Sequence, residues 1–130
     1  LGTFNHCLAV SKEGRVFGCG SNYNWQLGFS KEKISVLSFT KISSLLWYEI
    51  RAAYAGLYHS LFETREGKIL SCGDGYYGQL LLKSGTSNYV YPPVGTTITS
   101  GAAFCIAGNS ISAIFIGSDP PSNTRIDDYE

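Results

Sequence analysis

Two segments of this chain, 53 residues apart, share a pattern of histidine, glycine and glutamine that constrains the fold more than any other feature. Residues 6–28, HCLAVSKEGRVFGCGSNYNWQLG, align without a gap on residues 59–81, HSLFETREGKILSCGDGYYGQLL. Nine of the 23 aligned positions are identical, whereas average composition would give roughly one or two. A repeat of about 50 residues is typical of propeller blades and solenoid units, which bury their apolar faces against their neighbours.

Each copy predicts a β-hairpin. In the first copy, the apolar run 7–10 is a strand, Lys12 to Gly14 form the turn, and 15–19 form the return strand. The second copy repeats this order with Gly67 in the turn, where glycine can adopt a positive φ. Aromatic residues make up 14% of the chain, and it has 15 glycines. This composition, with short apolar runs, predicts an all-β fold with tight turns.

A third and incomplete copy is predicted near the end of the chain. Residues 101–108, GAAFCIAG, resemble residues 56–63 and place Phe104 at the position of His59. A return strand over 111–116 would follow. A degenerate terminal unit is common in repeat proteins.

The segments between the copies carry weaker signals. Residues 34–42 alternate loosely and predict an outer strand, and 45–56 predict a strand entering the next unit, with a short helix as the alternative. We therefore expect repeats over 1–117, in units of about 2–55, 56–100 and 101–117. Residues 118–130 are polar, contain two prolines, and indicate a tail or linker.

Charge and hydropathy exclude some classes of protein. Ten basic and ten acidic residues cancel, so the chain lacks the basic excess of a nucleic-acid surface. No apolar run approaches the ~20 residues of a membrane-spanning helix. The sequence begins with Leu1 and shows no secretion signal, so we expect a piece of a longer, intracellular protein, in the cytoplasm rather than the nucleus.

The four cysteines, Cys7, Cys19, Cys72 and Cys105, form no C-x-x-C pair. Structural zinc sites usually take closely spaced pairs of ligands, so we expect no metal. Without a secretion signal, we expect reduced thiols that pack between repeats as small apolar side chains. A redox or metal-binding protein is the alternative.

Histidine in both copies argues for a structural role and against catalysis. His6 and His59 occupy equivalent positions, whereas a catalytic base is normally unique. We expect both to be hydrogen-bonding struts, and we expect neither enzymatic activity nor a cofactor. The predicted structural positions of the repeat are His6, Gly14, Gly20, Gln26, His59, Gly67, Gly73 and Gln79.

Four aromatic residues lie in the glycine-rich loops that follow the hairpins: Tyr23, Trp25, Tyr76 and Tyr77. Tyrosine and tryptophan are favoured anchors at protein interfaces. We therefore predict a protein-interaction surface at these loops. The alternative is that the rings fill space between repeats.

The pattern G-x-x-H-x-L, a glycine turn, an apolar strand and then G-Q-L-G resembles the repeat of the regulator of chromosome condensation family. The second copy carries Gly56, His59, Leu61, Gly67, Gly73, Gly78, Gln79 and Leu80; the first carries His6, Leu8, Gly14, Gly20, Gln26, Leu27 and Gly28. Trp25 replaces the glycine before Gln26, and Leu81 replaces the glycine after Leu80.

The resemblance implies a seven-bladed β-propeller, of which this chain supplies two blades and part of a third. Open strand edges would then be covered by the remaining blades or by a host assembly. The expected role is a non-enzymatic scaffold that binds a protein partner. The alternative that the resemblance implies is guanine-nucleotide exchange on a Ran-type small GTPase.

Overall fold

The computed structural model describes residues 6–82, 89–97, 102–107 and 112–116, with side chains for the first two ranges. Its elements are β1 (His6–Val10), β2 (Val16–Ser21), β3 (Ser35–Lys41), the 3-10 turn η1 (Ser43–Leu45), β4 (Ile50–Ala55), β5 (His59–Thr64), β6 (Ile69–Asp74), β7 (Tyr89–Gly95), β8 (Ala102–Ala107) and β9 (Ser112–Ile116). The all-β prediction is confirmed.

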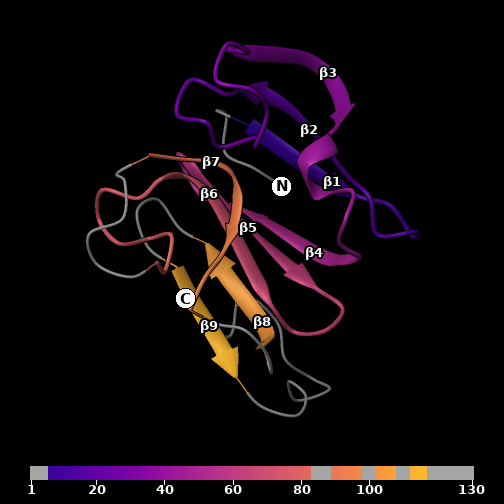
Figure 1. The fold of residues 1–130 in the computed structure, drawn as a ribbon, viewed down its shortest axis with the longest axis vertical. Coiled ribbons are helices and arrows are strands. Elements are labelled where there is room, and N and C mark those ends of the chain that lie inside the picture. Colours follow the sequence, from indigo (N-terminus) through magenta and orange to yellow (C-terminus); the bar gives the residue numbers. More distant parts are fainter. Residues whose placement is uncertain (1–5, 83–88, 98–101, 108–111, 117–130) are drawn as a thin grey trace.

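The strands form three antiparallel sheets in the orders β1-β2-β3, β4-β5-β6-β7 and β8-β9. The sheets follow one another through the molecule, with the four-stranded sheet in the middle (Figure 1). Strand β1 packs against β4, and β8 packs against β5 and β4. The first strands of successive sheets thus lie near one another, as in the blades of a propeller.

The register of the strands shows which elements are equivalent. His6 pairs with Gly20 in the first sheet, and His59 pairs with Gly73 in the second, at the same 53-residue offset along the whole hairpin. Strands β3 and β7 also correspond, and both ladders contain an irregularity at the same place, between Gly18 and Gly20 and between Ser71 and Gly73. The first sheet therefore reproduces β5, β6 and β7.

The third hairpin corrects one detail of the predicted alignment. The β8–β9 register matches that of β4–β5 at a constant offset of 52 residues, including the irregularity that follows Ile50 in one and Ala102 in the other. Phe104 therefore corresponds to Ala52 and not to His59. The predicted turn at 109–110 lies outside the described residues.

Two connecting segments also differ from expectation. Residues 45–56 are not one strand: Leu45 ends the turn η1, and β4 begins only at Ile50. This strand joins the second sheet, as expected for a strand that enters the next unit. Strand β7 was not predicted, because Pro92 and Pro93 interrupt its pattern. Proline is tolerated there because β7 is an edge strand.

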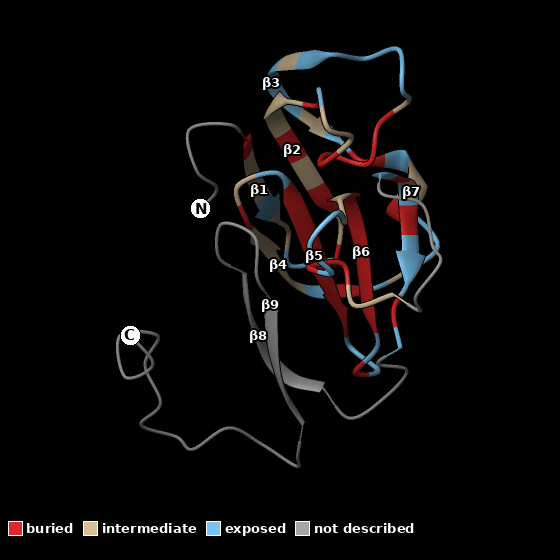
Figure 2. Ribbon diagram, turned by 90° about the vertical axis from the view of Figure 1, so that its left-hand side faces the viewer, coloured by how far each residue is buried: buried red, intermediate tan, exposed pale blue. Residues whose placement is uncertain are grey.

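The second sheet is the more deeply buried one. Every residue of β5 is buried, whereas β1 and β2 are mostly half-buried (Figure 2). An apolar cluster joins the first two sheets, and its buried members are Val16, Leu27, Phe29, Ile42, Leu45, Ile50, Phe62, Leu70 and Cys72. The core therefore lies between successive sheets and not within one.

Candidate interaction surface

The loops after β2 and β6 are built in the same way around a buried glutamine. Gln26 Oε1 accepts a hydrogen bond from the backbone N–H of Asn24 at 2.9 Å, and Gln79 Oε1 accepts one from that of Tyr77 at 2.8 Å. Both glutamines are almost fully buried. Each buried glutamine thus bonds the backbone two residues earlier in its own loop, and this bond holds the loop backbone in one conformation.

The predicted aromatic residues stand out from these loops. The exposed fractions of Tyr23, Tyr76 and Tyr77 are 74%, 66% and 70%. The rings of Tyr76 and Tyr77 pack edge to face with centroids 5.1 Å apart. Both loops lie on the left of Figure 1, and the hairpin turns lie on the right. The two loops that carry these exposed rings therefore lie on the same side of the molecule, opposite the hairpin turns.

Trp25 is half-buried and links the first two sheets. Its ring lies edge to face with that of Tyr89 in β7, with centroids 5.8 Å apart, and Lys31 Nζ is 4.7 Å from the tryptophan ring. Nearby, Gly28 approaches Pro93 so closely that an added Cβ would lie 2.9 Å from the proline ring. Trp25 therefore packs between the first two sheets, and its use as an interface anchor stays a prediction.

The two departures from the glycine pattern fall at backbone positions that favour glycine. Trp25 and Leu81 have φ values of 66° and 59°, and Gly78 and Gly28 occupy the corresponding positions of the other loop at 80° and 71°. A non-glycine residue in this left-handed region costs about 1–2 kcal/mol. The two loops thus share one backbone conformation, although Trp25 and Leu81 do not favour it.

The predicted histidine strut joins two sheets. His6 Nε2 lies 2.9 Å from Ser60 Oγ, and Ser60 Oγ lies 2.5 Å from the carbonyl oxygen of Gln26. The hydroxyl has one hydrogen, which it donates to that carbonyl. His6 Nε2 must therefore donate to Ser60, so the imidazole does not act as a base toward the serine and the pair is not a catalytic dyad.

Burial and the neighbouring His59 lower the pKa of His6 to about 4, so the ring is neutral at pH 7. Nδ1 of His6 has no hydrogen-bond partner among the described residues. No carboxylate therefore orients this ring in the way a catalytic triad requires.

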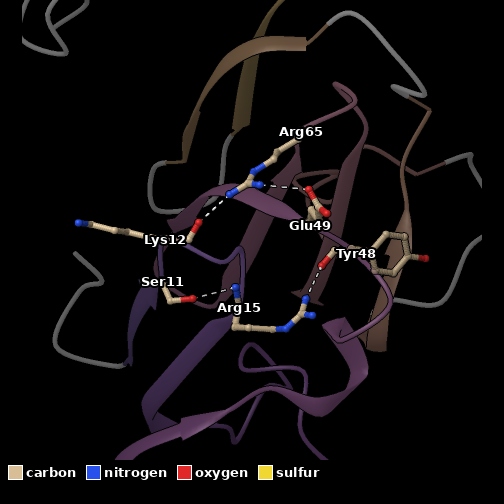
Figure 3. A network of polar contacts seen from close by, with 6 residues as sticks. All are labelled: Ser11, Lys12, Arg15, Tyr48, Glu49 and Arg65. Carbon is tan, nitrogen blue, oxygen red and sulfur yellow. Dashed lines mark hydrogen bonds and ion pairs between the residues drawn. The ribbon is translucent and has the colours of Figure 1, made fainter.

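On the side of the molecule opposite these loops, a network of hydrogen bonds connects the hairpin turns of the first two sheets (Figure 3). Arg65 donates to the carbonyl oxygen of Lys12 at 2.7 Å and to Glu49 Oε2 at 3.1 Å. Arg15 Nη1 reaches the carbonyl oxygen of Tyr48 at 3.4 Å. Gly14 has φ 84°, and an added Cβ there would lie 3.1 Å from the Ile50 nitrogen. The turn of one sheet is thus fixed to the chain that enters the next.

Sequence reasoning identified the repeated glycines, glutamines and histidines but missed several partners. Ser60 and Arg65 were not singled out, although each bonds across the two sheets. Glu63 is also buried, where it pairs with Arg51 and accepts a hydrogen bond from Tyr54 Oη at 3.2 Å. Position 60 directly follows the repeated histidine, which is the signal that could have identified Ser60.

The described residues contain neither a metal-binding cluster nor a membrane-spanning helix. No group of three or more His, Cys, Asp or Glu side chains there is placed to hold a metal ion. No described helix is long and apolar enough to cross a membrane. Cys7, Cys19 and Cys72 are free thiols, and Cys105 lies where side chains are not described.

A four-stranded antiparallel blade, flanked by strands that repeat its register, defines a β-propeller repeat protein. The family model of the "Regulator of chromosome condensation (RCC1) repeat" matches residues 2–26 and 50–79. The second match starts at the first residue of β4, where the complete blade begins. The chain belongs to the RCC1 repeat family.

Several curated proteins are similar to this chain. It is 37% identical over 87 residues to the "Secretion-regulating guanine nucleotide exchange factor" of Bos taurus, which matches 67% of the chain and 18% of that protein. It is 33% and 36% identical to two Arabidopsis thaliana proteins, "RCC1 domain-containing protein RUG3, mitochondrial" and "Ultraviolet-B receptor UVR8". These matches cover 82% and 75% of the chain, and 24% and 21% of the relatives.

Solved structures show the same fold. The yeast RCC1 protein Prp20, in a complex with Kap60, superimposes with a TM-score of 0.75 at 22% identity, over 89% of this chain and 29% of that one. Human WBSCR16 gives a TM-score of 0.73 at 23% identity, over 90% and 29%. The chain thus spans about a fifth of the curated relatives and under a third of the solved propellers.

Proposed function

We propose that this chain is a non-enzymatic protein-interaction module whose contact surface is the aromatic loop face. The observation that carries the proposal is the exposure of Tyr23, Tyr76 and Tyr77 on two equivalent loops. Tyrosine gives a large contact area at a low cost in side-chain entropy. The partner is a protein, and the surface would act as a scaffold.

The rigidity of the loops supports this role. Besides the glutamine bonds, the N–H of Tyr76 bonds Asp74 Oδ1 at 2.9 Å, and that of Tyr23 bonds Ser21 Oγ at 3.2 Å. A surface that is ordered before binding loses less entropy when the partner docks. The exposed rings and the fixed backbone together favour recognition of a protein.

Guanine-nucleotide exchange on a Ran-type small GTPase is the second candidate. One relative is named a guanine nucleotide exchange factor, and one matching structure is titled for the binding of Prp20p to Gsp1p and histones. Exchange needs no acid–base residue on the propeller, so the absence of a catalytic dyad at His6 does not distinguish the two functions.

A closed propeller is the assembly in which we propose that the chain works, inside the cell and in the cytoplasm. Further blades would cover the outer face of the first sheet, because the equivalent face of the second sheet is buried against the first. Fractionation of cells that express the full-length protein would test the location.

The test of the loop face compares two triple variants in the full-length protein. Tyr23→Ser, Tyr76→Ser and Tyr77→Ser together remove the exposed rings, and Leu37→Ser, Phe39→Ser and Trp47→Ser remove exposed apolar side chains elsewhere. Partners identified by crosslinking in cells are purified and titrated by calorimetry. We expect the loop variant to weaken binding about tenfold or more and the control to leave it unchanged.

Equal effects of the two variants would contradict the loop-face proposal. A nucleotide-release assay with a Ran-type GTPase then separates the two functions. Release accelerated by substoichiometric protein supports exchange, and binding without release supports the scaffold.

A further inference from the structure

Cys7 and Cys19 form a pair of opposite thiols that the β5–β6 hairpin does not reproduce. They are directly opposite in the β1–β2 ladder, so their side chains leave the same face of the sheet. In the second sheet the equivalent residues are Ser60 and Cys72. Only the first repeat therefore has cysteine at both positions of this cross-strand pair among the two complete hairpins.

The pair lies on the face of the first sheet that points away from the second. His6 bonds Ser60, and Leu8 and Val10 pack against the shared core. Side chains alternate along a strand, so Cys7 lies on the opposite face. Both cysteines are half-buried, whereas Cys72 is fully buried.

The geometry suits a disulfide. Directly opposite residues of antiparallel strands have Cα atoms about 4.5–5.5 Å apart, and disulfides need about 4.4–6.8 Å. We propose that Cys7 and Cys19 are a site of reversible disulfide formation, oxidised by a peroxide and reduced by a dithiol.

The reaction is balanced with hydrogen peroxide as the oxidant. One thiolate attacks a peroxide oxygen, which breaks the O–O bond and leaves a sulfenic acid and, after protonation, one water. The sulfur of the second cysteine then displaces the sulfenic oxygen as a second water and forms the S–S bond. Two thiol hydrogens leave the protein, and the peroxide is reduced by two electrons.

The second repeat shows what this oxidation would change. Ser60 Oγ and Cys72 Sγ both lie against the carbonyl oxygen of Gln26, at 2.5 and 3.3 Å. Ser60 and Cys72 thus both donate hydrogen bonds to the first sheet. The reduced cysteine pair has S–H hydrogen to donate to an equivalent carbonyl, and a disulfide has none. Oxidation would therefore remove a polar contact with whatever repeat covers this face.

The rate of oxidation should depend on pH. Desolvation raises the pKa of Cys19, and the neighbouring Cys7 raises it further. Because the thiolate is the reactive form, disulfide formation should accelerate from pH 7 to pH 8.5.

Peptide mapping tests the proposal in the purified protein. Trypsin cleaves after Lys12 and Arg15, between the two cysteines, so a disulfide links two otherwise separate peptides. After peroxide treatment and alkylation, we expect this linked pair with two hydrogens fewer, at about tenfold or more the yield of any link to Cys72, which is opposite Ser60 and not opposite either cysteine. Dithiothreitol should restore both alkylated peptides.

The matched variants are Cys7→Ser, which copies Ser60 of the second repeat, and Cys72→Ser, which leaves the pair intact. We expect the first to abolish the linked peptide and the second to preserve it, with circular dichroism confirming that both are folded. If the folded wild-type protein yields separate sulfinic acids or alkylated cysteines, the proposal is wrong. A link that forms as readily to Cys72 would contradict it equally.

Discussion

The buried His6 predicts that acid destabilises this protein well before its carboxylates are protonated. The pKa of His6 is lowered from 6.5 to about 4 by burial and by His59. Between these two values the unfolded chain binds a proton that the folded chain does not. The free energy of unfolding therefore falls as the pH falls through this range, and His6 has no such effect above about pH 7.

The size of the effect follows from the shift. Each pKa unit is worth about 1.4 kcal/mol, so the full effect of His6 approaches about 3 kcal/mol near pH 4. At pH 5, where most exposed carboxylates are still ionised, about 2 kcal/mol should already be lost relative to pH 7.5. That is a large part of the stability of a small domain.

Urea unfolding at pH steps from 7.5 to 5 measures this loss in the wild-type protein and in His6→Gln. The glutamine amide can still donate to Ser60 but does not titrate, and His59 is present in both proteins. We expect the variant to lose about 2 kcal/mol less over this range. Equal slopes would refute the assignment of the acid sensitivity to His6, and a nuclear magnetic resonance titration of His6 would check its pKa directly.

Three further predictions concern the backbone and the strut, each measured by urea unfolding. Leu81→Gly should be more stable than Leu81→Ala by about 1 kcal/mol, because φ is 59° there; an alanine variant of equal or greater stability would contradict the strain. Gly73→Ala should cost about 3 kcal/mol, since the new Cβ would lie 2.5 Å from the Tyr58 oxygen, whereas Gly78→Ala, with open space, should cost about 1 kcal/mol. Ser60→Ala should cost about 1–3 kcal/mol by removing the buried partner of His6, and exposed Ser38→Ala should cost almost nothing.

The sequence was sufficient to predict the hairpins, because their turns carry local signals. Gly14 and Gly67 both have positive φ, at 84° and 87°, as the turn pattern requires. The offset of the third hairpin was not recovered. Its short apolar strands fit several alignments, and only the pairing across β8 and β9 distinguishes them. Non-local register of this kind is set by tertiary contacts and not by local sequence.

The candidate site was predicted less completely than the fold. Exposed Tyr23 and Tyr76 were identified from their place in glycine-rich loops, but the contact of Trp25 with Tyr89 was not. That contact depends on β7, a strand hidden by its prolines. The repeat itself could have revealed β7, because β3 shifted by one repeat length falls on it.

The repeated positions and the variable ones have different physical roles. The side chain of Gln26 is buried and accepts a hydrogen bond from the Asn24 N–H, which fixes its own loop. The backbone carbonyl of the same residue accepts hydrogen bonds from Ser60 and Cys72 of the next sheet, so a replacement that loosens the loop would disturb two blades at once. Tyr77, by contrast, takes the place of Asn24 in the first copy, and its side chain is exposed to solvent. The left-handed backbone at Trp25 shows that the interface between blades holds a loop in shape even where the sequence opposes it. A frame fixed in this way leaves the loop side chains free to change, and specificity for a partner is expected to reside there.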